Sequence, residues 1–244
     1  MQIITIGNQK GGTAKTATAA AIAQAGAAHG LKVLAIDLDP QANLSFALRA
    51  DTRHKGSYEL LEGEPARQTI QETAQGIDTI ASSRNLATVT TTTGSAKRLQ
   101  RALQPIKGIY DLIVIDTPPT AGELLYNALQ ASTGLVIPLL ADIFGLQGLY
   151  QIADTAKQFK QSNPGLQVKG FVLTRYDNRS SLTKAMKANI TAKAAELGIP
   201  CLAEIREGVA IREAAALQQS LFEYAPKSKP AQDYMKLYEM IMEG

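Results

Sequence analysis

Short apolar runs alternate along the chain with longer segments of helical spacing. The runs predict strands, because buried parallel strands are almost continuously apolar. They comprise residues 3–6, 33–37, 77–81, 112–116, 135–140 and 168–173. Helices are expected over residues 15–29, 57–62, 65–75, 144–160 and 181–197, with a last helix after Pro230. This alternation predicts an α/β fold with a doubly wound, mostly parallel sheet flanked by helices, in a single domain over residues 1–244.

The amino-acid composition indicates the cellular compartment of the protein but not its function. The 244 residues are 45% hydrophobic and carry a net charge of +3, a bias too small to imply nucleic acid by itself. Cys201 is the one cysteine, so no disulfide can form within the chain. No apolar run approaches the ~20 residues of a membrane span, and Met1 leads directly into the first strand. We therefore expect a cytoplasmic protein without a signal peptide or membrane contact.

The segment between the first strand and the first helix has the chemistry of a phosphate-binding loop. Residues 8–17 read NQKGGTAKTA. Glycines let the backbone wrap an anion, and the positive end of the following helix attracts it. Lys15 is expected to reach the β- and γ-phosphates, and the Thr16 hydroxyl to bind Mg²⁺. Ala14 stands where the usual pattern has glycine, which costs about 1 kcal/mol or more only if φ is positive there.

Aspartates stand at the carboxyl ends of two predicted strands. Asp37 and Asp39 belong to DLDPQ after one strand, and Asp116 opens DTPP after another. Open α/β sheets bind ligands at this edge, and unpaired buried charge is costly. Mg²⁺ and a hydrolytic water explain these carboxylates better than structure alone, although Asp37 could instead be a turn or cap residue.

These segments resemble motifs of the ParA/MinD superfamily of deviant-Walker ATPases. The loop is similar to K-G-G-x-G-K-[ST], with Lys10 as the second, signature lysine, although Ala14 and Ala17 depart from the usual residues. Residues 37–41 match D-x-D-P-Q, and residues 174–182 resemble T-x-Y-D-x-R-T-x-L of the ParA branch. The match to I-P-R-N-V-R-L-S-E-A over residues 205–214 is partial. The resemblance indicates a Soj-like short form without an N-terminal helix-turn-helix.

The resemblance implies roles for individual residues. Lys10, Lys15 and Asp39 are the expected catalytic residues, with Asp39 positioning the attacking water and Lys10 reaching the partner subunit's phosphates. Thr16, Asp37, Asp39 and Asp116 are the expected magnesium ligands or supporting residues. Nucleotide contacts are expected from Lys10, Gly11, Gly12, Thr13, Ala14, Lys15, Thr16, Ala17, Arg175, Ile205 and Arg206.

Basic residues gather after the predicted strand at 168–173. They attract phosphate backbones without reading bases, which predicts salt-sensitive, sequence-independent DNA binding, although a solvated lysine face remains the alternative. Arg212 lies two residues after the position of the family's DNA-contacting arginine, where this chain has Ala210. The expected DNA contacts are Arg179, Lys184, Lys187 and, with a weaker correspondence, Arg212.

The resemblance implies an ATPase that partitions plasmids or chromosomes. Two subunits would close over two ATP molecules with Mg²⁺, and the dimer would bind non-specific double-stranded DNA on the nucleoid. A ParB-type centromere-binding protein would stimulate a slow hydrolysis that releases the DNA. Two alternatives are a positioning ATPase for another cargo, MinD-like or acting on protein clusters, and a nucleotide-binding switch with little hydrolysis. The acidic residues of the last helix favour core packing over a membrane anchor.

Overall fold

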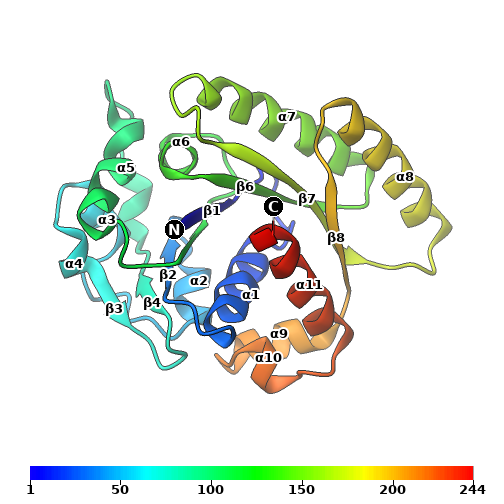
Figure 1. Ribbon diagram of the computed structural model, residues 1–244, viewed down its shortest axis with the longest axis horizontal. Helices are drawn as coiled ribbons and strands as arrows, with labels where there is room; N and C mark the ends of the chain where they lie inside the picture. The colour runs from blue at the N-terminus through cyan, green and yellow to red at the C-terminus, as the bar shows by residue number, and fades with distance from the viewer. Residues whose placement is uncertain (244) are drawn as a thin grey trace.

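The computed structural model describes residues 1–243, which form one eight-stranded sheet (Figure 1). The strands lie in the order β3-β4-β2-β5-β1-β6-β7-β8, and every neighbouring pair is parallel except β3 with β4. This confirms the predicted doubly wound, mostly parallel sheet. The strands are β1 (Gln2–Ile6), β2 (Val33–Asp37), β3 (Ile70–Glu72), β4 (Asp78–Ile80), β5 (Leu112–Asp116), β6 (Gly134–Leu140), β7 (Gln167–Tyr176) and β8 (Cys201–Arg206).

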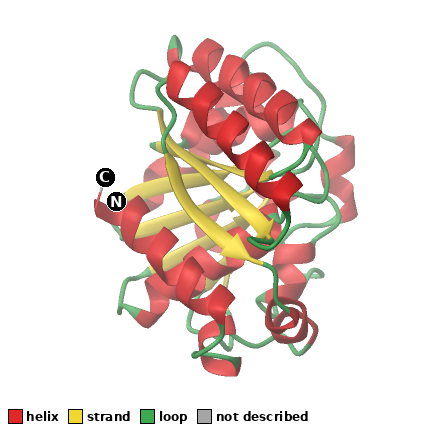
Figure 2. Ribbon diagram, turned by 90° about the vertical axis from the view of Figure 1, so that its right-hand side faces the viewer, coloured by secondary structure: helices red, strands yellow, loops and turns green. Residues whose placement is uncertain are grey.

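Helices cover both faces of the sheet (Figures 1 and 2). One face carries α1 (Lys15–Ala28), α9 (Val209–Ala216), α10 (Leu221–Tyr224) and α11 (Lys229–Glu243). The other carries α3 (Ser57–Leu61), α5 (Arg98–Leu103), α6 (Glu123–Ala131), α7 (Ile143–Lys160) and α8 (Ser181–Glu196). The short helices α2 (Asn43–Ala47) and α4 (Ala66–Thr69) lie in the connections after β2 and before β3.

Strand β5 shows why the central strands read as unbroken apolar runs. All five of its residues are buried, and successive side chains point to opposite faces of the sheet. Leu112 and Val114 join the apolar cluster under α1 and α11, whereas Ile113 and Ile115 join the cluster under α3, α5 and α6. Because each face is covered, residues 112–115 are all apolar, and the strand carries a polar side chain only at its carboxyl end, Asp116.

Helix α1 packs closely on the sheet because its residues are small. A Cβ atom at Gly26 would lie 3.0 Å from Leu112 Cδ2 and 3.1 Å from Val33 Cγ2. Helix α11 then covers α1 with an apolar side that includes the buried residues Leu237 and Ile241. The prediction that the last helix packs in the core is thus confirmed. Within residues 1–243, no helix combines the length and the apolar character that a bilayer crossing requires.

One connection differs from the expected elements, and several further elements were not expected. A helix was expected over 65–75, but α4 ends at Thr69 and Ile70–Glu72 form β3, an antiparallel edge strand on β4. Pairing with β4 outweighs the helical preference of these residues. The pattern of residues within the segment does not reveal this pairing. Strand β8 and the helices α2, α6, α9 and α10 were likewise not expected from the sequence.

Strand β1 marks the point where the winding of the sheet reverses. It lies between β5 on one side and β6 on the other, and the loop that leaves it leads directly into α1. In open α/β sheets the crevice at the carboxyl ends of the strands, beside such a reversal, is the usual ligand site. The loop at residues 7–14 occupies this position.

Candidate nucleotide-binding site

The loop after β1 is held in shape by hydrogen bonds to neighbouring strands. Asn8 Nδ2 donates to the carbonyl of Pro138 at 2.7 Å, and Asn8 Oδ1 accepts from the Lys10 amide at 3.0 Å. On the other side, the Thr174 hydroxyl donates to the carbonyl of Thr13 at 3.1 Å. Ties to both β6 and β7 fix the loop before any ligand arrives, which lowers the ordering cost of binding an anion.

Ala14 adopts the left-handed conformation, with φ 60° and ψ 32°. The φ angle of Ala14 is therefore positive, the case in which alanine is strained and glycine is not. This backbone strain costs about 1 kcal/mol. Gly12 also has a positive φ, 75°. The carbonyl of Ala14 accepts the Thr18 amide of α1 at 2.9 Å, so the strained residue begins the helix.

Lys15 lies in the first turn of α1, with its ammonium folded back into the loop. Its Nζ donates to the carbonyl of Lys10 at 2.9 Å. Burial lowers the pKa of the Lys15 ammonium, while the carboxylates of Asp116 and Asp39 act in the opposite direction. The predicted phosphate-binding lysine and two of the predicted acidic residues thus share one electrostatic environment.

The three aspartates converge at the carboxyl edge of β2 and β5, where Asp37 and Asp116 are register partners. Burial raises the pKa of Asp37 to about 6, although hydrogen bonds from Ser45 and the Asp39 amide oppose it. Burial, and then the charge of Asp37, raise the pKa of Asp116 well above its usual range. Like charges this close are stable together only beside a cation or a proton.

The carboxylates differ in how many protein donors they engage. Both oxygens of Asp37 accept hydrogen bonds, Oδ1 from the Asp39 amide and Oδ2 from the amide and hydroxyl of Ser45. These hydrogen bonds fit the turn or cap role considered for Asp37 from the sequence, and its expected role beside Mg²⁺ stays a prediction. Asp39 Oδ1 accepts the Gln41 amide at 3.0 Å. Asp116 is fully buried, and its Oδ2 atom has no hydrogen-bond partner among residues 1–243.

The unpartnered Asp116 oxygen fits a divalent cation. Within residues 1–243 no cluster of three His, Cys, Asp or Glu side chains could hold a metal ion by itself. Mg²⁺ usually keeps several waters and takes only one or two protein carboxylates plus phosphate oxygens. The Asp116 carboxylate and the Thr16 hydroxyl would supply such a small number of protein ligands. Hydrogen bonding by the Thr16 hydroxyl lowers the Asp116 pKa, against the effect of burial.

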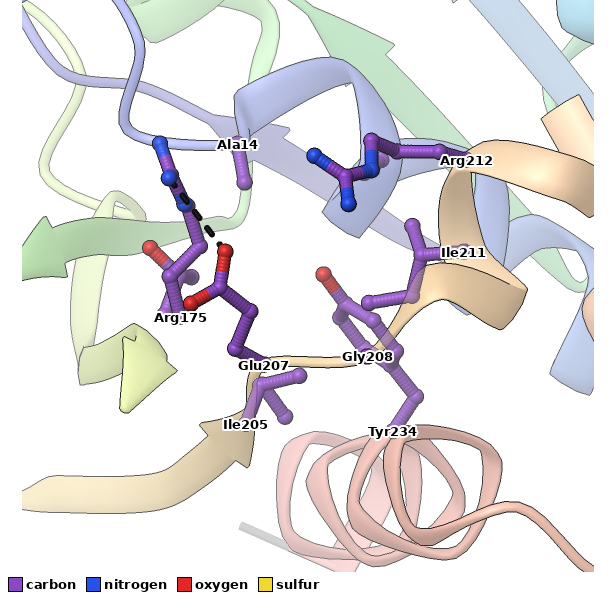
Figure 3. A pocket seen from close by; sticks show the side chains of 10 residues that line it. Ala14, Arg175, Ile205, Glu207, Gly208, Ile211, Arg212 and Tyr234 are labelled. Atoms are coloured by element: carbon purple, nitrogen blue, oxygen red, sulfur yellow. Dashed lines mark hydrogen bonds and ion pairs between the residues drawn. The ribbon is translucent and has the colours of Figure 1, made fainter. Parts of the chain in front are cut away.

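A cavity of about 220 Å³ opens beside the first turn of α1 (Figure 3). Its walls come from the loop and α1, the end of β7, the end of β8, and helices α9 and α11. Arg175 and Glu207 close one side through an ion pair of 3.3 Å. The lining residues are Ala14, Ala17, Thr174, Arg175, Ile205, Glu207, Gly208, Ile211, Arg212 and Tyr234.

Most of the predicted base-side contacts meet in this cavity, but Arg206 does not. Arg175 and Ile205 line it as expected, whereas the Arg206 side chain is bound to Asp233 of α11, with Nη2 to Oδ1 at 2.6 Å and Nε to Oδ2 at 2.8 Å. Glu207, the next residue, lines the cavity instead. Successive residues leaving a strand point to opposite sides, so a one-residue difference decides which side chain faces the ligand.

Lys10 lies at the rim of the loop. Its ammonium pairs with both carboxylate oxygens of Asp142, at 3.1 and 2.9 Å, and lies 4.9 Å from the centre of the Phe144 ring. Its side chain is 27% exposed. Asp142 also caps α7 by accepting the Gly145 amide at 2.7 Å. The predicted signature lysine is therefore held by its own subunit.

The predicted DNA-contacting residues lie on two separate parts of the molecule. Arg179 follows β7 with its side chain 89% exposed, and Lys184 and Lys187 lie on α8. Nearby acids offset part of this charge, since Arg179 pairs with Asp177 and Lys187 with Glu204. Arg212 instead lies on α9, in the wall of the 220 Å³ cavity.

Two functional candidates had no recognisable signal in the sequence. Tyr234 lines the cavity from α11, and Ser45 of α2 anchors Asp37. Tyr234 lies far along the chain from the phosphate loop, whereas Ser45 lies only eight residues after Asp37 but outside the DLDPQ motif. The pairing of Asp142 with Lys10 spans 132 positions of the chain. Contacts of this range come from the topology of the sheet.

The fold and this site define a P-loop nucleotide-binding protein that carries a second lysine in its phosphate loop. A family model described as an AAA domain matches residues 1–168. The chain is 32% identical to the chromosome-partitioning ATPase Soj of Thermus thermophilus, over 98% of this chain and 94% of that protein. It belongs to the ParA/MinD family, among relatives that are chromosome-partitioning ATPases.

Solved structures agree with this placement. The cobyrinic acid a,c-diamide synthase of Mycobacterium smegmatis, solved with ADP and magnesium, superposes with a TM-score of 0.83 at 29% identity, over 98% of this chain and 93% of that one. The septum site-determining protein MinD of Pyrococcus horikoshii, complexed with Mg-ADP, gives 0.80 at 27% identity, over 98% and 94%. The same scaffold thus occurs with different biological roles, so function must be argued from the site.

Proposed function

We propose that this protein is an ATP-hydrolysing partition switch whose ATP-bound dimer holds non-specific DNA. The observation that carries the proposal is the convergence of Lys15, Asp39 and Asp116 at the end of a preformed phosphate loop. ATP and Mg²⁺ are the cofactors that this arrangement fits, and two similar structures contain a nucleotide with magnesium. The base would lie in the cavity between the ends of β7 and β8.

The protein's own groups would divide the work of phosphoryl transfer. The Lys15 ammonium neutralises charge on the terminal phosphates, and Asp39 orients and polarises the attacking water. Mg²⁺, held by Thr16 and Asp116, would supply further charge neutralisation when bound. The phosphate loop and the segment after β5 lie side by side. A Cβ atom added at Gly11 would lie 3.8 Å from the Cβ atom of Pro119. Residues 117–119 can therefore respond to the γ-phosphate.

Lys10 would complete the site of a second subunit. In one chain, its ammonium faces Asp142 at the rim of the loop, where two loops could approach each other. Closure of two subunits over two nucleotides would move each Lys10 to the partner's phosphates, where it neutralises charge developing in transfer. A ParB-type partner would stimulate the reaction, which in its absence would be slow.

DNA retention would rest on charge and avidity. Arg179, Lys184 and Lys187 supply a basic surface on and before α8, and dimerisation joins two such surfaces. Their acidic neighbours make each single surface weak. Affinity for DNA would therefore depend strongly on the dimer and on salt, as a nucleotide-gated switch on the nucleoid requires.

Retention of a non-specific duplex tests the proposal. The protein is measured without nucleotide and with ADP, ATP or a non-hydrolysable ATP analogue, at two salt concentrations. Binding that needs ATP or the analogue and weakens at higher salt supports it, and Lys184→Ala with Lys187→Ala should then reduce retention. Binding that ignores the nucleotide, or no binding at all, contradicts it.

A second candidate is a positioning ATPase that acts on another cargo. The pairing of Lys187 with Glu204 and of Arg179 with Asp177 favours it, because these pairs reduce the attraction for DNA. A membrane-anchored version through α11 is disfavoured, since Leu237 and Ile241 of that helix are buried. Nucleotide-dependent dimerisation without DNA retention would select this candidate. A dimer that forms but shows no turnover would select a nucleotide-binding switch.

A further inference from the structure

Arg212 lies between two cavities that flank the first turn of α1. One is the 220 Å³ cavity described above, and the other, of about 370 Å³, lies between α1, α2, α9 and α10. Both are lined by Ala14, Ala17, Ile211 and Arg212. In Figure 3 the Arg212 side chain extends from α9 toward α1, with its guanidinium facing the interior of the cavity.

The guanidinium of Arg212 has no acidic partner in the part of the chain that the structure describes. Among the ion pairs within residues 1–243, none includes Arg212. The nearest carboxylates in sequence are engaged elsewhere, because Glu207 pairs with Arg175 and Glu213 accepts from the Tyr224 hydroxyl. Arg212 thus brings a positive charge to the amino end of α1, which is itself positive. An anion between the two would make this arrangement favourable.

Within residues 1–243, the part of the α1 start that lines both cavities supplies no side-chain donor, whereas Thr16 and Gln24 line the larger cavity alone. Ala14 and Ala17 line both cavities and carry only methyl groups. Lys15 is turned away, into the loop, where it donates to Lys10 and faces Asp39 and Asp116. A phosphate lying over Ala17 therefore has Arg212 as its charged neighbour.

We propose that Arg212 binds the phosphate next to the ribose, the α-phosphate, and so helps to hold both ATP and ADP. The assignment rests on the proposed nucleotide site. The terminal phosphates belong near Lys15, Asp39 and Asp116, and the base belongs near Arg175 and Ile205. Arg212 lines the stretch between these ends, where the α-phosphate must lie. A guanidinium suits this role because it presents several donors in a planar fork.

This assignment replaces the DNA contact expected for Arg212 from its position in the chain. Arg212 would also supply a charged contact beside Ala14 of the loop and Ala17 of α1, whose side chains have no polar atoms. The contact is made by α9, which follows β8, so binding would tie this helix to the first turn of α1.

Nucleotide affinity of the Arg212→Ala protein tests the proposal. Displacement of a fluorescent ADP analogue by ADP and by ATP, with Mg²⁺, gives both affinities. Loss of a charge-assisted contact predicts that both fall by about tenfold, equivalent to about 1.4 kcal/mol. Arg212→Lys should lose less, because it keeps the charge. Arg67→Ala, which removes an exposed arginine from α4, serves as the matched control and should change neither affinity.

The outcomes separate this inference from the proposed function. Equal losses for ADP and ATP support the α-phosphate contact. Unchanged affinities, or a loss confined to ATP, overturn it while leaving the nucleotide site intact. If the unaltered protein binds neither nucleotide, the proposed function fails instead. Thermal unfolding without nucleotide checks that each variant is folded, since Arg212 is exposed and its replacement should change stability little.

Discussion

The Nζ atom of Lys10 lies 2.9 Å from Oδ2 of Asp142, so the phosphate loop is joined to the residue that caps α7. The two residues are partly exposed, which keeps the Coulombic gain small and the pair easy to open. In a closed dimer Lys10 would have to leave Asp142 for the partner's phosphates. The ion pair therefore competes with the active arrangement.

Asp142→Asn should release Lys10 while keeping the helix cap, because asparagine caps helices as well as aspartate. We expect the dimerisation constant with a non-hydrolysable ATP analogue to rise about five- to thirtyfold, because each of the two subunits loses a competing pair worth about 0.5–1 kcal/mol. Light scattering coupled to size exclusion measures it. The control adds Lys10→Ala to Asp142→Asn, which should abolish the increase in dimerisation. An unchanged dimer fraction would show that Asp142 does not restrain Lys10.

Ala14→Gly should stabilise the protein. Glycine removes the strain of φ 60°, which outweighs the extra entropy of the unfolded chain, for a net gain of about 0.5–1 kcal/mol in the free energy of unfolding. Urea denaturation measures this. Ala42→Gly, at φ 56° before α2, is a matched control that should gain similarly without altering nucleotide affinity. A loss of stability in both variants would refute the strain argument.

Asp116→Asn should stabilise the nucleotide-free protein and abolish the stabilisation by Mg²⁺ with ADP. Its carboxyl is fully buried near Asp37 and Asp39, so the charged form is unfavourable without a cation. Removing that charge relieves about 1 kcal/mol or more at neutral pH. Thermal unfolding with ADP, in the presence and absence of Mg²⁺, tests both parts. The same Mg²⁺-dependent shift in the variant would remove Asp116 from the metal site.

Tyr234 should make the protein sensitive to alkali. Burial raises its pKa to about 12, above the usual value near 10, so the folded state holds its proton where the unfolded state has lost it. The free energy of unfolding therefore falls as pH rises from about 10 to 12, by up to about 3 kcal/mol from this group. Tyr234→Phe should reduce this fall. Identical slopes for variant and parent would contradict the assignment.

Arg206→Ala should reduce stability more than nucleotide affinity. Its guanidinium fixes β8 to α11 through Asp233, whose side chain is 9% exposed, and its loss leaves that carboxylate unpaired. We expect a cost of about 1–2 kcal/mol, discounted because Arg206 itself is partly exposed. Lys236→Ala, an exposed residue of α11, is the control and should be near neutral. A large loss of ADP affinity at unchanged stability would restore the expected nucleotide contact of Arg206.

The sequence by itself determined the fold class and the chemistry of the loop. Continuous apolar runs such as residues 112–115 require burial on both faces, and Lys15, Thr16, Asp39 and Asp116 mark strand ends and a helix start by local pattern alone. Local order suffices for these features, because backbone geometry fixes which residues meet at the carboxyl edge of a parallel sheet.

Only the tertiary structure decided the backbone of Ala14, the partners of the charged side chains and the direction of Arg206 and Arg212. A φ angle depends on what holds the loop, here Asn8 and Thr174. Basic residues that look unopposed along the chain meet acids from other elements, as Lys187 meets Glu204. Electrostatic energy depends on distance in space, and residues far apart in sequence set it.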